Sequence, residues 1–151
     1  MIAGCTPWPP ELARRYRAEG YWQGITLNEM VRRSAQAHAD KLALIDGENS
    51  ATYAQLVERS DRLAVKLAQL GLQSRERVIF QLPNSIEFLY AFFALLRIGV
   101  IPVMTLPAHR LTELRHFAQH TDAVSHLIPG RSSSFDHGEL ALSLIHISEP
   151  T

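Results

Sequence analysis

The apolar residues of this chain recur at two spacings, one typical of amphipathic helices and the other typical of short strands. The helical spacing predicts helices over residues 11–18, 27–39, 53–70, 85–98 and 110–120. Short apolar runs bounded by turn residues predict strands over residues 41–47, 50–52, 77–82, 100–104 and 124–128. Because strands alternate with helices, we expect an α/β fold with a mainly parallel sheet and right-handed crossover connections.

Residues that cap helix ends support these boundaries. Thr26 with Glu29, and Thr52 with Gln55, have the spacing of a capping box, in which a hydroxyl and a longer polar side chain pair reciprocally with backbone amides. We expect Asn84 to be the N-cap of the fourth helix, because a short polar side chain there accepts a hydrogen bond from an unpaired amide.

The helix over residues 85–98 is apolar on nearly every side. Such a helix must be covered all round, and a domain of this size has little structure with which to cover it. We therefore expect further parts of the protein to pack on this helix, and the chain alone to expose its apolar surface and aggregate. Pro102 lies in the strand that follows, which predicts an edge or an irregular position because proline lacks a backbone donor.

Composition narrows the class of protein. Of the 151 residues, 46% are apolar, and 15 Lys and Arg balance 15 Asp and Glu. A net charge of zero disfavours general binding to nucleic acid or to anionic membranes. The one cysteine excludes an internal disulfide and a cysteine-based zinc site. The longest apolar stretch, residues 88–96, is too short for a bilayer span and no basic, apolar leader opens the sequence, so we expect a soluble, cytoplasmic protein.

Candidate ligand-binding residues are few. No Gly-x-Gly-x-x-Gly and no Gly-x-x-x-x-Gly-Lys-Ser/Thr occurs, and the nearest candidate for a phosphate loop, residues 130–134, reads as a surface loop. His116 and His120 share one helix face, His109 precedes them, and Asp122 follows them. Because the glutamate of the zinc-protease motif is missing, we expect exposed histidines on this helix and no metal site.

The sequence gives equally little support for a catalytic nucleophile. Ser85 lies at a strand-to-helix junction, but glycines do not flank it as they do in a nucleophile elbow. Cys5 has no cationic neighbour that would lower the pKa of its thiol. An N-terminal group of aromatic residues lies among arginines and suits packing of a helix on its own domain better than base stacking. Its members are Trp8, Tyr16, Tyr21 and Trp22, with Arg14, Arg15 and Arg17. The residues therefore indicate no catalytic, cofactor-binding or metal-binding constellation.

Several segments, in order along residues 5–141, resemble one enzyme family. The opening segments resemble aryl-acid adenylating enzymes, the 2,3-dihydroxybenzoate–AMP ligases of siderophore biosynthesis, and the middle segments resemble the adenylate-forming superfamily as a whole. They are Thr6–Arg17, Gly20–Trp22, Tyr53–Leu56, Asp61–Ala64, Arg77–Asn84, Glu87–Phe88 and Phe93–Val103. Two later segments, Leu106–Arg110 and Ile128–Pro129 with Phe135–Asp136, are similar to the aryl-acid branch.

This resemblance implies the N-terminal part of the large domain of a two-step ligase. Such an enzyme uses ATP and Mg²⁺ to adenylate an aryl acid, here 2,3-dihydroxybenzoate or salicylate, and passes the acyl group to the phosphopantetheine thiol of an aryl carrier protein. The family's phosphate loop, aryl pocket and catalytic lysine normally follow the last matching segment, so none is assigned to a residue here. His109 and Arg110 match a family segment without an assigned role. Alternatives are another acyl-activating enzyme, such as an acyl-CoA ligase, or a small non-catalytic α/β interaction module.

The last residues, 142–151, resemble, residue for residue, the translation of a sequencing adapter of the transposase type. A native final strand over residues 142–147 is the alternative. With the adapter interpretation, residues 1–141 are the N-terminal portion of an AMP-dependent synthetase/ligase domain, and residues 142–151 are not native. We then expect the chain alone to be inactive.

Overall fold

The computed structural model describes residues 6–129 of the chain. Helices and strands alternate over most of this length, as the apolar spacing predicts. The helices are α1 (Pro10–Ala18), α2 (Leu27–Ala37), α3 (Tyr53–Gln69), α4 (Ile86–Arg97) and α5 (Leu111–Thr121). The strands are β1 (Leu42–Asp46), β2 (Asn49–Thr52), β3 (Arg77–Phe80), β4 (Ile101–Met104) and β5 (Ala123–Leu127).

The strands form two separate sheets. β3 is the centre of a parallel sheet with the order β4-β3-β5, and Pro102 lies on the outer strand β4, as predicted. β1 and β2 instead pair with each other as an antiparallel hairpin. The expectation of a mainly parallel sheet is thus confirmed for three strands, while the first two strands make a hairpin because only a short turn separates them.

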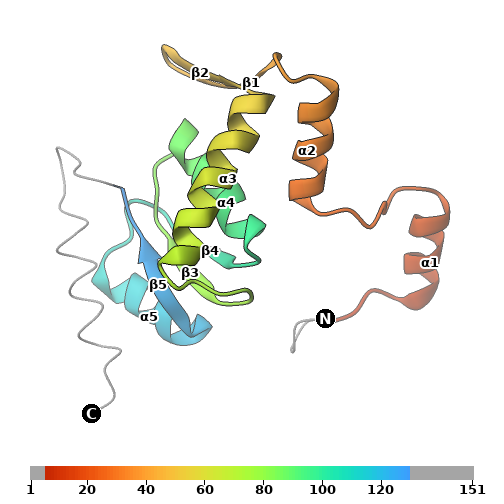
Figure 1. Cartoon of the computed structure of the whole chain (residues 1–151). Helices are drawn as coiled ribbons and strands as arrows, with labels where there is room; N and C mark the ends of the chain where they lie inside the picture. Colours follow the sequence, from red (N-terminus) through yellow and green to blue (C-terminus); the bar gives the residue numbers. More distant parts are fainter. Residues whose placement is uncertain (1–5, 130–151) are drawn as a thin grey trace.

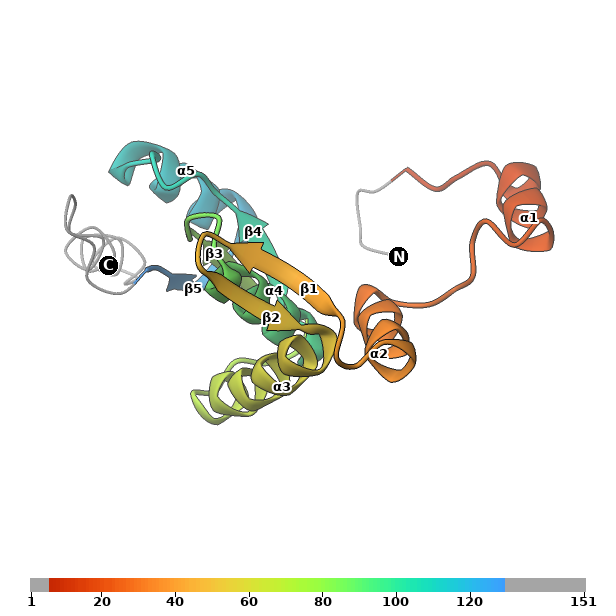
Figure 2. The same ribbon diagram turned by 90° about the horizontal axis from the view of Figure 1, so that it is seen from above.

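Helices cover both faces of the parallel sheet (Figures 1 and 2). Val78 and Phe80 of β3 pack with α3 and α4 in the largest core cluster. Ile79 points to the opposite face, where it packs against Leu114 of α5. This alternation along β3 follows from the pleat of a strand, and it makes β3 the most deeply buried element of the sheet.

The apolar helix α4 is partly covered by the rest of the chain. Its residues Ile86, Tyr90, Ala91, Ala94 and Leu95 are buried, and its remaining apolar side chains are half-buried. α3 packs along one side of α4, the sheet lies against a second side, and the β1–β2 hairpin lies against its N-terminal half. The hairpin adds a layer that the spacing of apolar residues does not reveal, but five large apolar side chains of α4 stay half-exposed, so the expectation that further parts of the protein pack on this helix stays a prediction.

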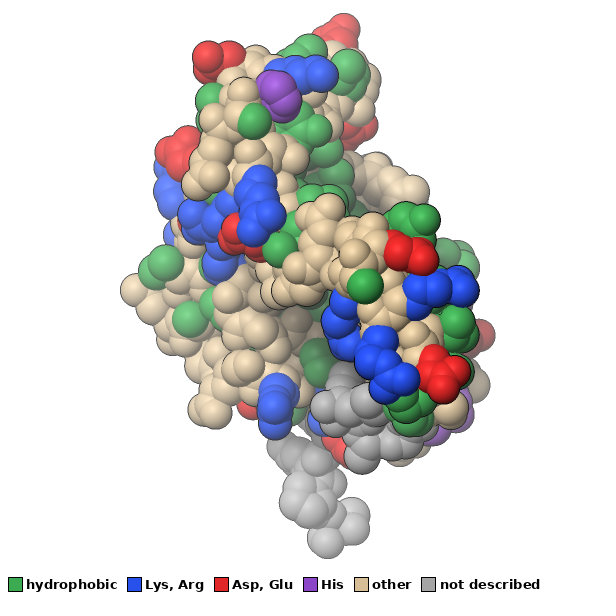
Figure 3. Space-filling view, turned by 90° about the vertical axis from the view of Figure 1, so that its right-hand side faces the viewer, with side chains coloured by type: hydrophobic (Ala, Val, Ile, Leu, Met, Phe, Trp, Pro, Cys, Tyr) green, Lys and Arg blue, Asp and Glu red, His purple; other side chains and the backbone are tan. Residues whose placement is uncertain are grey.

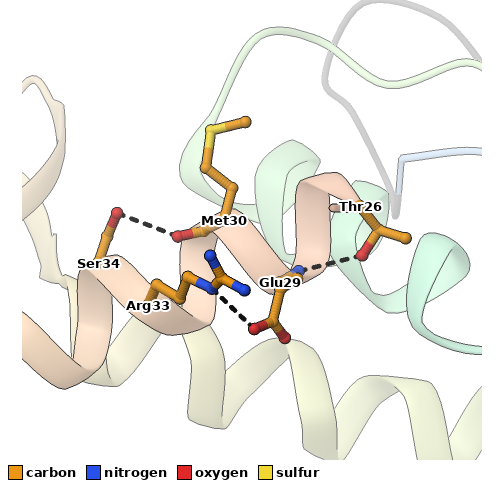
Figure 4. Close-up of polar contacts among 5 residues, drawn as sticks. All are labelled: Thr26, Glu29, Met30, Arg33 and Ser34. Atoms are coloured by element: carbon orange, nitrogen blue, oxygen red, sulfur yellow. Dashed lines mark hydrogen bonds and ion pairs between the residues drawn. The ribbon is translucent and has the colours of Figure 1, made fainter. Parts of the chain in front are cut away.

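The capping signals of α2 and α3 differ in outcome. Thr52 and Gln55 form the predicted capping box at the start of α3. At α2 the Thr26 hydroxyl accepts the amide of Glu29 (3.1 Å), but the Glu29 carboxylate binds the Arg33 side chain (2.9 Å) instead of returning to the cap (Figure 4). A charged partner one turn along the helix therefore replaces half of the predicted box.

The N-cap of α4 is Ser85, which corrects the prediction of Asn84. Ser85 is extended, and its hydroxyl accepts the amide of Phe88 (3.3 Å). The carboxylate of Asp46, from the end of β1, accepts the amide of Ile86 (3.3 Å). A carboxylate from a distant strand thus supplies the second acceptor at this helix start, which a local capping rule does not anticipate.

Asp61 of α3 connects three helices. Its carboxylate lies 2.7 Å from the guanidinium of Arg32 on α2 and 2.8 Å from that of Arg97 on α4. The first contact is a hydrogen bond, whereas the second has the distance of an ion pair without the alignment of a hydrogen bond.

Among the described residues, no helix is both long and apolar enough to cross a membrane.

Candidate functional site at the carboxyl edge of the sheet

The carboxyl ends of β3, β4 and β5 meet at one edge, which is where parallel α/β sheets place ligands. Two polar side chains are buried at this edge, Gln81 directly after β3 and Thr105 directly after β4. The Thr105 hydroxyl and backbone amide both donate to the carbonyl of Phe80 (3.3 and 3.1 Å). These bonds continue the pairing of β3 and β4 beyond the ends of the strands.

Gln81 is the centre of the edge, with an exposed fraction of 0%. Its side-chain amide donates to the carbonyls of Leu106 and His109, each at 3.0 Å. Its Oε1 lies 3.1 Å from Nε2 of His126 on β5. Since Oε1 can only accept, His126 carries a proton on Nε2 when this bond forms. Gln81 therefore holds the β4–α5 loop and β5 in one arrangement.

His109 and Arg110 shape the loop that Gln81 holds. Nδ1 of His109 accepts the amide of Leu106 (3.1 Å), and its ring packs against Phe117 with centroids 5.2 Å apart. The Arg110 guanidinium donates to the carbonyls of Pro107 (2.9 Å) and His109 (3.0 Å). Both side chains thus bind the backbone of their own loop, which gives them a positioning role.

The first turn of α5 completes the edge. The amide of Arg110 donates to the Glu113 carboxylate at 3.0 Å. This bond, together with the amide of Glu113 itself, holds the pKa of the Glu113 carboxyl below its ordinary value of 4.5. A negative charge at this position is also favourable for the amides at the helix start.

A hollow of about 440 Å³ lies beside the edge, between α3, α4 and the segments that follow β3 and β5. Most of its lining is apolar, and Ser85 and Glu87 are the polar residues on its wall. Because the Ser85 hydroxyl already caps α4, the hollow offers an apolar side chain a place to pack and presents no activated nucleophile.

The structure separates the other candidate residues. His116 and His120 stack on one face of α5, 5.7 Å between ring centroids, and both are exposed, as expected. Asp122 is the left-handed C-cap of α5. Within residues 6–129, no group of three His, Cys, Asp or Glu side chains is placed to hold a metal ion. Cys5 and the candidate loop 130–134 lie outside the described residues.

Sequence reasoning missed Gln81 and His126 as members of the edge. The available signal was a glutamine directly after an apolar strand, where a buried amide requires partners. Its partners lie 25 to 45 residues away, so their identity depends on the fold. The edge holds no paired nucleophile and base among the described residues, and its hydrogen bonds serve to fix two loops. Its geometry is therefore that of a rigid platform on which further residues of a site can be carried.

Comparison with known proteins assigns this platform to a family. Residues 31–148 match the family model described as AMP-binding enzyme. The 2,3-dihydroxybenzoate-AMP ligase of Bacillus subtilis is 42% identical over 141 residues, which are 93% of this chain and 26% of that protein. The salicyl-AMP ligase / salicyl-S-ArCP synthetase of Mycobacterium tuberculosis is 42% identical over 95% of this chain and 26% of that protein.

A solved structure agrees with the sequence matches. The apo structure of MbtA from Mycobacterium smegmatis superposes with a TM-score of 0.87 at 43% identity, over 97% of this chain and 27% of that one. The chain spans about a quarter of the length of the curated relatives it matches. Since the family model covers most of the chain and includes the whole carboxyl edge, the chain belongs to the AMP-binding enzyme family.

Proposed function

We propose that the chain is the N-terminal portion of an aryl-acid AMP ligase that acts in siderophore biosynthesis. The observation that carries the proposal is the match to relatives named for 2,3-dihydroxybenzoate and salicylate adenylation over more than nine-tenths of the chain. Residues 1–141 are in this proposal the native portion, and residues 142–151 are an adapter translation. The family match runs to residue 148, so the boundary after Ala141 rests on the sequence of the tail alone.

The proposed reaction has two steps. A carboxylate oxygen of the aryl acid attacks the α-phosphorus of ATP, and the bond to the β-phosphate oxygen breaks, which releases pyrophosphate. The phosphopantetheine thiol of an aryl carrier protein then attacks the acyl carbon, AMP leaves with the bonding electrons, and the thiol proton passes to a base. Mg²⁺ accompanies ATP and neutralises its phosphate charge.

The described residues contribute positioning. Gln81 fixes the β4–α5 loop against β5, and α3 and α4 hold the other face of the sheet. We place the ATP-binding, aryl-binding and catalytic groups of the parent enzyme outside residues 6–129. The parent enzyme is in this proposal cytoplasmic, because its aryl carrier substrate and ATP are available there.

The test uses the complete gene recovered from source DNA. The full-length protein is assayed for ATP–pyrophosphate exchange with 2,3-dihydroxybenzoate, salicylate and benzoate, and the 151-residue chain is assayed in parallel. We expect exchange with at least one hydroxylated acid, at least about 100-fold weaker exchange with benzoate, and background exchange for the chain alone. Exchange with none of these acids, or equal exchange by the chain alone, would refute the proposal.

The acceptor is tested separately. Intact-protein mass spectrometry detects acyl transfer to a phosphopantetheinylated aryl carrier protein, and chromatography detects an acyl-CoA when coenzyme A is offered instead. Preferred transfer to the carrier protein is expected. Preferred formation of acyl-CoA would identify the alternative acyl-CoA ligase. Genomic sequence that continues past Ala141 in the same frame, with residues other than 142–151, is expected from the adapter interpretation, and an identical native sequence there contradicts it.

A further inference from the structure

Two histidines lie one turn apart on the solvent face of α5. The rings of His116 and His120 are 5.7 Å apart between centroids, and the angle between the ring planes is only 15°. Side chains four residues apart on a helix are direct neighbours. Both rings are exposed, and neither takes part in a hydrogen bond or an ion pair with any other described residue. Their ring nitrogens are therefore available to a ligand from solvent.

The core fixes which side of α5 carries this pair. Leu114, on the opposite side of the helix, is fully buried against Ile79 of β3, and Phe117 packs at the same contact. Figures 1 and 2 show α5 on the outside of the sheet, away from α3. His120 lies in the last turn of α5, where the helix dipole favours a positive charge. The pair is thus presented to solvent at the end of a helix where a cation is stabilised.

The other described histidines lack this arrangement. Nδ1 of His109 accepts the amide of Leu106, and Nε2 of His126 is bound to Oε1 of Gln81. His38 is exposed but lies by itself at the C-terminal end of α2. Within residues 6–129, the pair on α5 is the one case of two histidine rings in contact.

The exposed carboxylates are poorer ligands for a cation because many already face arginines. Figure 3 shows acidic side chains interspersed with lysine and arginine side chains over the face of α1 and α2. Glu29 binds Arg33 at 2.9 Å. Glu58 on α3 lies 3.2 Å from Arg62. A metal ion would have to displace a guanidinium at these positions, whereas on α5 it displaces only water.

We propose that His116 and His120 form a chelating site for a divalent transition-metal ion of the group Zn²⁺, Ni²⁺ and Cu²⁺. Neutral imidazole is a preferred ligand of these ions. With bonds of about 2.0–2.1 Å to each nitrogen, one ion bridges nitrogens up to about 4 Å apart. Nitrogens on the facing edges of two neighbouring rings reach this separation by side-chain rotation.

The site is a two-residue chelate and not a hydrolytic centre. Water completes the coordination of the ion, because no third His, Cys, Asp or Glu side chain of the described part of the chain is placed to bind it. The expectation that α5 carries no metal site follows from the missing glutamate of the zinc-protease motif. That glutamate is a catalytic base, and a chelate of two histidines does not require it.

A bound ion links two turns of α5 and favours the folded helix. In the unfolded chain the two histidines are not held at this spacing, so the ion binds the native state more tightly and stabilises it. α5 directly follows the loop that Gln81 holds, so this stabilisation reaches the carboxyl edge of the sheet from its outer side. The inference needs only α5 and does not depend on the proposed function.

Zn²⁺ binding to the full-length protein, prepared without an affinity tag or nucleotide and stripped of metal, tests the proposal by isothermal titration calorimetry. The pH is kept above the ordinary histidine pKa of about 6.5, because only neutral imidazole binds the ion. We expect His116→Asn and His120→Asn each to weaken binding at least about tenfold, because each removes the chelate. The matched control, His38→Asn, should leave binding unchanged.

Spacing variants distinguish a chelate from binding by a single histidine. In the His120→Asn protein, Thr112→His creates a new pair with His116 at a spacing of four residues and should restore the affinity. In the His116→Asn protein, Arg115→His places the two histidines five residues apart, on different faces of α5, and should not restore it. Pulsed electron paramagnetic resonance with Cu²⁺ should detect two coupled imidazoles in the unmodified protein and one in each single variant.

Three results would overturn the proposal. The first is an unchanged Zn²⁺ affinity in both single variants. The second is a single coupled imidazole in the Cu²⁺ spectrum of the unmodified protein. The third is equal recovery of affinity with Thr112→His and Arg115→His, because binding would then not depend on the helical spacing of the two rings.

Discussion

Replacement of Gln81 by leucine should weaken the carboxyl edge of the sheet. The change keeps an approximate side-chain volume but removes three hydrogen bonds, to the carbonyls of Leu106 and His109 and to His126. If each bond contributes about 1 kcal/mol net, losing all three lowers the free energy of unfolding by about 3 kcal/mol. Because Leu106 is largely exposed, water can replace the partner of its carbonyl, and we expect a net loss of about 2 kcal/mol.

Urea unfolding followed by far-ultraviolet circular dichroism measures this loss. The unfolding midpoint should fall while the dependence of the unfolding free energy on urea stays constant. The matched control is Gln69→Leu, the same chemical change at an exposed position at the end of α3, which should alter the unfolding free energy by less than about 0.5 kcal/mol. If both variants unfold at the same urea concentration, the view that Gln81 ties the two loops together is wrong.

Further predictions concern the charges and the core. Asp61→Ala should lower the unfolding free energy by about 1 kcal/mol at low salt and by less at high salt, because its two ion pairs are partly exposed; equal losses at both salt concentrations would argue against an electrostatic cause. The pKa of Glu113 is lowered chiefly by the amide of Arg110, so its stabilisation is present above pH 4.5 and lost as the pH falls below it. Glu113→Gln should flatten this pH dependence in urea titrations, and an unchanged profile would contradict the assignment. Leu114→Ala, fully buried between α5 and the sheet, should cost about 2–5 kcal/mol, and Leu70→Ala, 81% exposed, should cost little; comparable losses would place the core elsewhere.

The sequence predicts elements better than it predicts their partners. Thr52 and Gln55 mark the start of α3 correctly because both members of a capping box are local. The N-cap of α4 lies one residue after the predicted Asn84. Asn84 has the higher N-cap propensity, but the Ser85 hydroxyl accepts the amide of Phe88, and the carboxylate of Asp46 from β1 accepts the amide of Ile86. Helix boundaries of this kind depend on tertiary contacts that no short window of sequence contains.

The covering of α4 is a second case in which tertiary contacts decide. Its apolar surface on all sides correctly predicts burial, but the cover comes from α3 and from the β1–β2 hairpin. The hairpin reads from sequence as two ordinary strands of an alternating α/β pattern. Only the pairing of Asp46 with Asn49 across a tight turn shows that these strands leave the main sheet.

For the candidate site, too, the sequence predicts the location better than it predicts the contacts between residues. The location at the carboxyl edge is expected for any parallel sheet, but the roles of His109 and Arg110 could not be read from their spacing. Both residues act through backbone carbonyls and amides of their own loop, and that loop is held by Gln81 from a distant strand. A family resemblance names the segment without supplying these contacts.

The position of the two tryptophans has a consequence for spectroscopy. Trp8 and Trp22 are the only tryptophans of the chain, and their rings pack on each other and on Tyr16 of α1. Tryptophan fluorescence therefore reports on the surroundings of α1 and carries no signal from the parallel sheet. In this chain the unfolding midpoint measured by tryptophan fluorescence should differ from the midpoint measured by circular dichroism. The two midpoints should coincide in a longer protein in which α1 packs against the sheet domain.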